Sequence, residues 1–213
     1  MFAENQAIPL FPTFVWMHQL NPEDTVRINN TIRAKLLSLL GPDAQQHENK
    51  ANQTNQNLHT LPEFQEFNQV LLKATKGVMD FLHVAEEGIE ITSCWANMNT
   101  KGAVNPAHTH PNNYLGGVYY VDTPENSGSI VFEDPRAQPR LISPRVSQST
   151  RENSGRATLN VEPGTLLLFP AWLVHSVEPN PSENLRISIS FNLMFSSFTE
   201  KVSPVQWTGN IPT

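Results

Sequence analysis

The repeat of apolar residues changes from helical to strand-like near residue 89. Before this point, residues 22–40 and 63–84 carry apolar side chains three and four positions apart, as amphipathic helices do. After it, short apolar or alternating runs are separated by Pro, Gly and Asn, which is typical of β-strands joined by turns. These runs cover residues 89–99, 116–122, 129–134, 165–170 and 186–195. Helices followed by strands favour an antiparallel β-sandwich or squashed barrel with external helices over a parallel α/β sheet.

The length of the chain fits one domain. Its 213 residues, of which 38% are hydrophobic, can bury a single good-sized core. We therefore expect one domain over residues 1–213. Residues 1–88 would supply a strand and flanking helices, and residues 89–198 the β-core, with an Arg-rich insertion at residues 135–163.

Residues 8–19 predict an edge strand, because prolines interrupt an otherwise apolar run. Asn21 and Pro22 then provide an N-cap and a first-turn proline for the first helix. Residues 43–60 are rich in Asn and Gln and almost devoid of apolar residues, so they are predicted to form a loop.

Charge and cysteine content limit the partners and the compartment. The net charge of −6 and the pI of about 5.6 give no clear nucleic-acid footprint and no membrane partner, since such surfaces are basic. The single cysteine, Cys94, excludes an internal disulfide and suits a reducing compartment. No secretion signal or membrane span is expected, so the prediction is a cytoplasmic protein. No pattern defines the oligomeric state, and a homodimer is one assembly open to the chain.

Three histidines have the spacing and context of metal ligands. His108 and His110 lie two residues apart in an extended segment, so both rings project from one face and can reach one ion. His175 follows a buried apolar run that ends at Pro170 and a turn. Three neutral ligands on one side of an ion leave its other positions open. This arrangement suits non-haem Fe(II), although the usual set has two His and one carboxylate.

Arg186 and Ser188 share one face of the last predicted strand, because Ile187 and Ile189 alternate with them. An Arg fork with a hydroxyl beside it matches a carboxylate, particularly inside a barrel where water cannot compete. The sequence therefore predicts a carboxylate-binding site next to the metal.

The order His108-Thr-His110, then His175, then Arg186-x-Ser188 resembles the Fe(II)/2-oxoglutarate-dependent oxygenase superfamily. More narrowly, HTHPNNYLGGVYYVDTPENSGSIVFEDPR and LLLFPAWLVHSVEPNPSENLRISISFN are similar to a group of 2OG-Fe(II) oxygenases found mainly in microbial and phage genomes. The resemblance implies a mainly β fold with flanking helices, built on a double-stranded β-helix (jelly-roll, cupin-like) core.

The resemblance also implies a reaction. Fe(II), 2-oxoglutarate as co-substrate and O2 would act together, with 2-oxoglutarate decarboxylated to succinate and CO2 while an unidentified primary substrate is hydroxylated. The catalytic metal ligands would be His108, His110 and His175, with Arg186 and Ser188 holding the co-substrate. A bacterial or phage-infected host cell is the expected source.

Further residues are candidates for binding the co-substrate. Tyr120 resembles the tyrosine whose hydroxyl prolyl hydroxylases use on the same carboxylate, and strand alternation means that either Tyr119 or Tyr120 faces inward. Asn97 and Asn99 share a strand face. They could bond the metal-chelating end of the co-substrate or could face solvent.

The third ligand position departs from the superfamily, which has His-x-Asp or His-x-Glu there. His110 is predicted either to bind the metal, as in three-histidine cupin sites, or to lie beside a metal-bound water. Aspartyl/asparaginyl hydroxylases have a similar segment that also lacks the carboxylate. A shifted register with Asn112 in the acid position is a weaker alternative. Asp134, at the end of a strand, is the remaining carboxylate candidate, although strand ends often carry such residues before a turn.

The insertion at residues 135–163 is poor in large apolar side chains and rich in arginine. It holds five of the 14 Lys and Arg residues against only Glu152 and Glu162. Long insertions of this kind are usually lids, binding loops or disordered segments. Two predictions stay open: a lid that presents cations to an anionic substrate, or a solvated loop. The arginines are Arg136, Arg140, Arg145, Arg151 and Arg156.

The predicted function is therefore a non-haem Fe(II)- and 2-oxoglutarate-dependent dioxygenase. One alternative is a cupin-type enzyme that binds its substrate directly to a three-His metal, and another is a metal-binding barrel without catalysis. Release of succinate would separate the first prediction from both alternatives.

Overall fold

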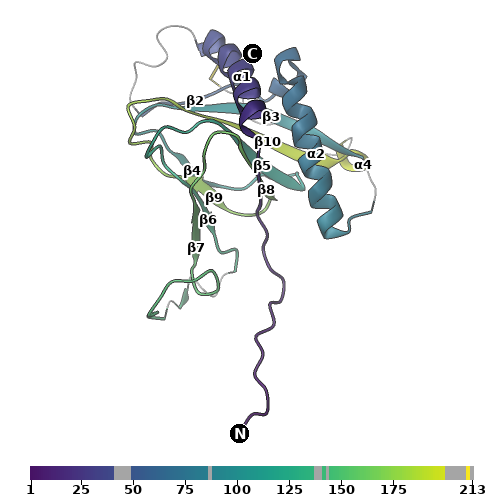
Figure 1. The fold of residues 1–213 in the computed structure, drawn as a ribbon, viewed down its shortest axis with the longest axis vertical. Helices are drawn as coiled ribbons and strands as arrows, with labels where there is room; N and C mark the ends of the chain where they lie inside the picture. Colours follow the sequence, from purple (N-terminus) through teal and green to yellow (C-terminus); the bar gives the residue numbers. More distant parts are fainter. Residues whose placement is uncertain (41–48, 86–87, 137–140, 143, 200–209, 212–213) are drawn as a thin grey trace.

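The computed structural model describes the whole chain except residues 41–48, 86–87, 137–140, 143, 200–209 and 212–213. In the part described, two β-sheets pack against each other and two long helices cover the outer face of the larger sheet (Figure 1). No described helix is both long and apolar enough to cross a membrane.

The larger sheet has six strands in the order β1-β8-β5-β10-β3-β2, and each neighbouring pair is antiparallel. Its edge is β1, as predicted for the N-terminal strand, but this strand is shorter than the apolar run suggested. The strands are β1 (Trp16–Gln19), β2 (Ala51–Gln53), β3 (Ile89–Asn99), β5 (Leu115–Asp122), β8 (Thr165–Pro170) and β10 (Arg186–Phe195).

The smaller sheet has four antiparallel strands in the order β4-β9-β6-β7. The two sheets together form a double-stranded β-helix, so the predicted fold class, mainly β with flanking helices, is confirmed. The strands are β4 (Asn105–His108), β6 (Ile130–Glu133), β7 (Arg156–Leu159) and β9 (His175–Val177).

Strand β10 shows how alternation divides the molecule into a core and a site. Its odd-numbered residues are buried against the helices, and each contributes about 1.5–3 kcal/mol by leaving water. Its even-numbered residues are polar and point between the two sheets. The odd set is Ile187, Ile189, Phe191 and Leu193, and the even set is Arg186, Ser188, Ser190 and Asn192.

The helices follow the predicted signals. Helix α1 (Pro22–Leu40) begins at the expected cap, where the Asn21 side-chain oxygen accepts a hydrogen bond from the Asp24 backbone N–H at 2.9 Å. Helix α2 (Gln65–Leu82) follows two short 3-10 turns, η1 (Leu58–Thr60) and η2 (Pro62–Phe64). A short α4 (Ser196–Thr199) comes after β10.

Two predicted loops contain strands. In residues 43–60, β2 pairs with β3, and buried Leu58 joins the main core. The sequence did not predict β2 because its residues are mostly polar, and hydrogen bonding to a neighbouring strand does not need an apolar pattern. In the Arg-rich insertion, β7 pairs with β6 at the free edge of the smaller sheet.

Candidate active site

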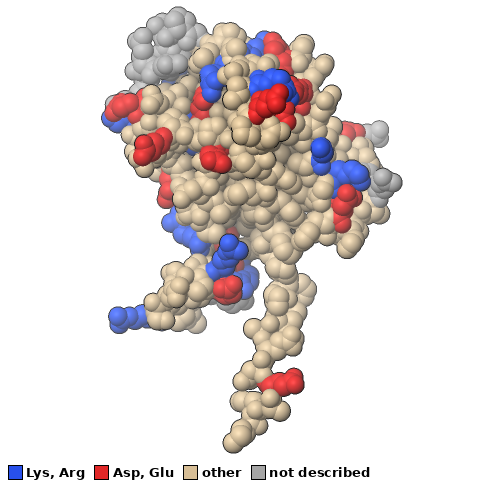
Figure 2. All heavy atoms as spheres, viewed as in Figure 1, with Lys and Arg blue, Asp and Glu red and all other residues tan. Residues whose placement is uncertain are grey.

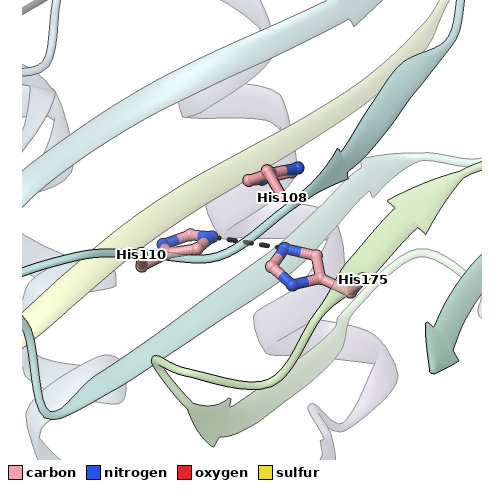
Figure 3. Close-up of side chains that lie close together, drawn as sticks. All are labelled: His108, His110 and His175. Atoms are coloured by element: carbon pink, nitrogen blue, oxygen red, sulfur yellow. Dashed lines mark hydrogen bonds between the residues drawn. The ribbon is translucent and has the colours of Figure 1, made fainter. Parts of the chain in front are cut away.

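His108, His110 and His175 converge in the structure (Figure 3). His108 ends β4 and His175 begins β9, and these two residues are partners in the antiparallel register. His110 lies two residues beyond β4, with its ring 5.0 Å from that of His175 between centroids. One nitrogen from each of the three rings lies within 4.8 Å of the other two. The three histidines that the sequence predicted as metal ligands therefore lie together in the structure, and their role as ligands stays a prediction.

Each of the three rings has its Nδ1 next to an oxygen acceptor. His108 Nδ1 lies 2.7 Å from the Pro106 carbonyl and His175 Nδ1 lies 2.9 Å from the Leu173 carbonyl. His110 Nδ1 is bonded to the side-chain oxygen of Asn192. Since these oxygens can only accept, Nδ1 must carry the proton, and each Nε2 keeps its lone pair for a ligand.

The spacing of the Nε2 atoms fits a cation. Nε2 of His110 and Nε2 of His175 lie 3.2 Å apart, so with both Nδ1 atoms protonated two lone pairs face each other. Two imidazoles bound at about 2.1 Å to one metal at right angles would have nitrogens about 3 Å apart. The donor set and its spacing therefore suit a divalent transition metal.

Burial keeps two of these imidazoles neutral. Desolvation lowers the pKa of His110 to about 4 and that of His175 to about 3, and the charge of His108 acts in the same direction on both. At neutral pH both rings therefore have a lone pair available for a metal. His108 is exposed and lies at the open side of the cluster.

Aromatic side chains and a glycine shape the space around His110. Phe169 packs edge-on against the His110 ring, and the Trp95 ring lies 5.8 Å from it between centroids. Gly116 lies on the adjacent strand, where an added Cβ would be 3.1 Å from His110 Nδ1. Apolar walls exclude water from the inner side of the cluster.

No carboxylate joins the three histidines among the described residues that could hold a metal. The Asp134 carboxylate is paired with the Arg136 guanidinium at 2.6 Å, with its side chain 8% exposed. Asp134 is thus held by an ion pair at the strand end, which is the ordinary explanation for this residue. The shifted register with Asn112 is not supported either, because Asn112 is an exposed turn residue with φ of 62°.

Arg186 is buried on the polar face of β10, and no described carboxylate forms an ion pair with it. It is 1% exposed, and its Nε and Nη2 have no hydrogen-bond partner in the described part of the chain. Its Nη1 lies 3.4 Å from the Ser188 hydroxyl, and its guanidinium carbon lies 5.2 Å from the centre of the Tyr120 ring. Burial lowers the pKa of Arg186 and raises that of Tyr120 to about 12. A buried cation with open donors is a site for an anion, since an unpaired buried charge is costly.

The two adjacent tyrosines face opposite sides of β5. Tyr119 faces the helices, where its hydroxyl donates to the Asn29 side-chain oxygen at 2.6 Å. Tyr120 lines the cavity, and its buried hydroxyl has no partner with hydrogen-bond geometry. Of the two candidates, Tyr120 is therefore the one that lies at the site.

Asn97 and Asn99 are both buried, so the alternative that they face solvent is wrong. The Asn97 oxygen accepts from Gln53 Nε2 at 2.7 Å, and its amide donates to the Ser190 hydroxyl at 2.9 Å. Asn99 is the register partner of Arg186, and its side-chain oxygen has no partner.

A small, partly open cavity lies beside these groups. It lies between the two sheets, where the metal-ligand candidates His108 and His175 line it together with the co-substrate candidates Asn97, Tyr120 and Ser188. Its polar lining includes Gln53, Asn97, His108, Tyr120, His175 and Ser188.

Sequence reasoning missed Asn192 and Gln53. Asn192 had a signal, because alternation along β10 places it on the same face as Arg186 and Ser188. No sequence signal pointed to Gln53, because nothing in its polar neighbours along the chain predicted that β2 would join the sheet beside Asn97.

Comparisons with known proteins agree with this geometry. Residues 93–192 match the family model described as "Putative 2OG-Fe(II) oxygenase". No curated protein matches the chain in sequence. Among solved structures, the chain is similar to AviO1 from Streptomyces viridochromogenes Tue57, with a TM-score of 0.62 and 13% identity over 87% of this chain and 91% of that chain.

Two further solved structures are similar at the same level. HygX from Streptomyces hygroscopicus, solved with nickel and 2-oxoglutarate bound, gives a TM-score of 0.60 and 13% identity, covering 93% of this chain and 92% of that chain. A Pseudomonas putida prolyl-4-hydroxylase gives a TM-score of 0.56 and 13% identity, covering 84% of this chain and 92% of that chain. At such identities the likeness demonstrates the fold.

The family match runs from β3 to the end of the polar face of β10, so it includes the three histidines, Tyr120, Arg186 and Ser188. This family implies iron and 2-oxoglutarate, and the three-His cluster is compatible with that metal. Residues 93–192 therefore carry a 2OG-Fe(II) oxygenase domain with a three-His site, whose primary substrate is unidentified.

Proposed function

We propose that His108, His110 and His175 hold Fe(II), and that Arg186, with Ser188 and Tyr120, holds the far carboxylate of 2-oxoglutarate. One observation carries the proposal: a buried guanidinium, with two donors that no described residue accepts from, contacts Tyr120 and Ser188, which line the same cavity as His108 and His175. When bound, the iron would supply O2 activation coupled to decarboxylation of 2-oxoglutarate.

The protein's own contribution is to place and desolvate the co-substrate. Nε and Nη2 of Arg186 can each donate a hydrogen bond to one carboxylate, in the two-pronged arrangement that arginine favours. The Tyr120 hydroxyl can donate a third hydrogen bond. Because Arg186 and Tyr120 are buried, these bonds are stronger than they would be in water. They also fix the distance between the far carboxylate and the histidine cluster.

Asn97 and Asn99 support the co-substrate in different ways. Asn97 lines the cavity and is held from both sides by Gln53 and Ser190, so it presents a fixed polar edge toward the histidines. Asn99 has a free side-chain oxygen next to Arg186 in register. We assign Asn97 to the chelating end of 2-oxoglutarate and Asn99 to orienting the guanidinium.

The primary substrate is proposed to be anionic. Arg145, Arg151 and Arg156 are exposed on the Arg-rich insertion, which protrudes from the body and carries basic side chains (Figure 2). A hollow at the base of the insertion is lined by Arg156 and Glu133, among others. Glu133 directly follows Phe132, which is the register partner of His175. The hollow therefore adjoins β6, the strand that pairs with β9, on which His175 lies. Arg140 lies outside the described residues, and Arg136 is paired with Asp134.

The test is an anaerobic titration of metal-free protein with Fe(II) and then 2-oxoglutarate, followed by the visible charge-transfer band of the bidentate complex. The band should be lost in His108→Ala and weakened in Arg186→Ala, with Arg151→Ala as an unaffected control on the insertion. With O2 and any accepted substrate, succinate should form in proportion to 2-oxoglutarate consumed. Bound iron without a band or succinate would instead favour the direct-binding cupin alternative.

The cytoplasmic location and the homodimer stay predictions. The N-terminal segment before β1 extends away from the body with exposed apolar side chains, among them Phe2, Leu10 and Phe11. A second copy is one partner for such a segment. The molar mass in solution, measured with and without residues 1–13, tests the homodimer.

A further inference from the structure

Asn192, on β10, lies between His110 and Ser93 of β3. It is 3% exposed and is the register partner of Ser93 on β3 and of Gly116 on β5. Its side-chain oxygen bonds His110 Nδ1, and its amide donates to the Ser93 hydroxyl at 2.8 Å. These contacts form a chain of three side chains, Ser93, Asn192 and His110, running from β3 through β10 to the metal cluster.

His110 differs from the other two histidines in what holds its ring. Nδ1 of His108 and Nδ1 of His175 bond backbone carbonyls two residues upstream in their own segments. His110 lies outside β4, and its Nδ1 depends on a side chain 82 positions away in the sequence. Its tautomer therefore depends on one replaceable residue, whereas the backbone fixes the other two.

We propose that Asn192, itself oriented by Ser93, is the positioning residue that makes His110 present its Nε2 lone pair as the third metal ligand. This inference rests on the proposed function, which assigns His110 to the metal. It explains how a histidine fills the position where the wider superfamily has a carboxylate. A carboxylate needs no tautomer to be chosen, but an imidazole binds metal through Nε2 only when Nδ1 carries the proton.

The amide is suited to this role. Its oxygen accepts from Nδ1–H but does not take the proton at neutral pH, so His110 stays a neutral ligand. In the orientation in which the amide oxygen faces His110, the amide nitrogen donates to the Ser93 hydroxyl at 2.8 Å, so both ends of the amide are paired. Without Asn192, neither tautomer of His110 would be selected by a hydrogen bond at Nδ1.

The experiment measures Fe(II) affinity anaerobically, by competition with a chromophoric chelator, in the full-length chain. Asn192→Ala should weaken affinity about 10–100-fold, which is typical for loss of a group that orients a metal-bound histidine. Asn192→Asp should recover most of this loss, because its carboxylate also accepts from Nδ1–H. Ser93→Ala should produce a smaller loss. Asn29→Ala is the matched control, since Asn29 is also buried and hydrogen-bonded but lies on α1, away from the site.

A second readout separates positioning from packing. In ¹⁵N-histidine spectra of the metal-free protein, His110 should be protonated at Nδ1 in the wild type and in Ser93→Ala, and should lose this preference in Asn192→Ala. If Asn192→Ala does not fold, the Fe(II) affinities and His110 spectra of Asn192→Asp and Ser93→Ala are compared with those of the wild type. Wild-type affinity in Asn192→Ala together with a loss in His110→Ala would overturn this inference alone. Wild-type affinity in His110→Ala would instead overturn the assignment of His110 as a ligand.

Discussion

The guanidinium of Arg186 lies over the ring of Tyr120, 5.2 Å from its centre, and both residues have buried polar atoms that no described residue pairs with by a hydrogen bond. The cation–π contact offsets only part of the cost of burying the charge. The remainder is a cost to the stability of the protein that a bound carboxylate would remove. Ligand binding and protein stability are therefore coupled at this residue.

Replacement of Arg186 by Met should separate function from stability. The variant should have an unchanged or higher melting temperature without ligand, because an apolar side chain of similar length replaces an unpaired buried charge. It should lose 2-oxoglutarate affinity by about 100-fold or more, since two charge-assisted hydrogen bonds disappear. Thermal unfolding and isothermal titration of the Fe(II) complex under nitrogen measure both quantities.

The control is Arg33→Met. Arg33 pairs with Asp122 at a partly exposed position, so this variant should lose at most about 1 kcal/mol of stability and no affinity for 2-oxoglutarate. Normal 2-oxoglutarate binding in Arg186→Met would remove Arg186 from the co-substrate site.

Metal-free protein should lose stability as the pH falls below about 6.5. Burial lowers the pKa of His110 to about 4 and of His175 to about 3, so between these values and 6.5 the unfolded chain binds more protons than the folded protein. The free energy of unfolding therefore rises with pH in this window. Each histidine should contribute on the order of 1–2 kcal/mol between pH 7.5 and pH 5.

Denaturant titrations in the presence of a chelator measure this dependence. His175→Gln removes one titrating group from the same buried position and should flatten the curve between pH 5 and 6.5. A curve identical to that of the wild type would show that His175 is not held neutral by burial.

The adjacent glycines of β5 should respond differently to alanine because they face opposite sides. A Cβ on Gly116 would lie 3.1 Å from His110 Nδ1, whereas a Cβ on Gly117 would lie 2.3 Å from the Phe191 ring. Gly116→Ala should therefore weaken Fe(II) affinity several-fold with a small loss of stability. Gly117→Ala should cost about 1–3 kcal/mol of stability or more by overpacking the core.

Metal titration and thermal unfolding of both variants make each the control for the other. Equal effects of the two substitutions on Fe(II) affinity would mean that the site responds to general destabilisation and not to the position of His110.

The sequence was sufficient for the parts of the fold that depend on periodicity. Alternation in residues 186–195 predicted both the strand and the shared face of Arg186 and Ser188, and the cap at Asn21 predicted the start of α1. The spacing of His108 and His110 predicted that their rings would reach one point. These features are local, so a single segment carries the whole signal.

Features that depend on distant partners were not predictable. Strand β2 is polar and exists because β3 lies next to it, and Gln53 enters the cavity through that pairing. The contact between Asn192 and His110 joins residues 82 positions apart, and polarity alone did not distinguish Asn192 from a surface residue. The choice between Tyr119 and Tyr120 likewise needed the register of β5 against β10.

Asp134 provides the last prediction, because it decides whether the metal site is complete without a carboxylate. Its carboxylate is paired with Arg136 and does not belong to the convergent set of described metal-ligand candidates. Asp134→Asn should therefore leave Fe(II) affinity within about 2-fold of the wild type, whereas His175→Ala should lower it by at least 100-fold, as expected for loss of a ligand. Chelator competition under nitrogen measures both. A loss in Asp134→Asn as large as that in His175→Ala would mean that this carboxylate reaches the metal and that the three histidines alone do not define the site.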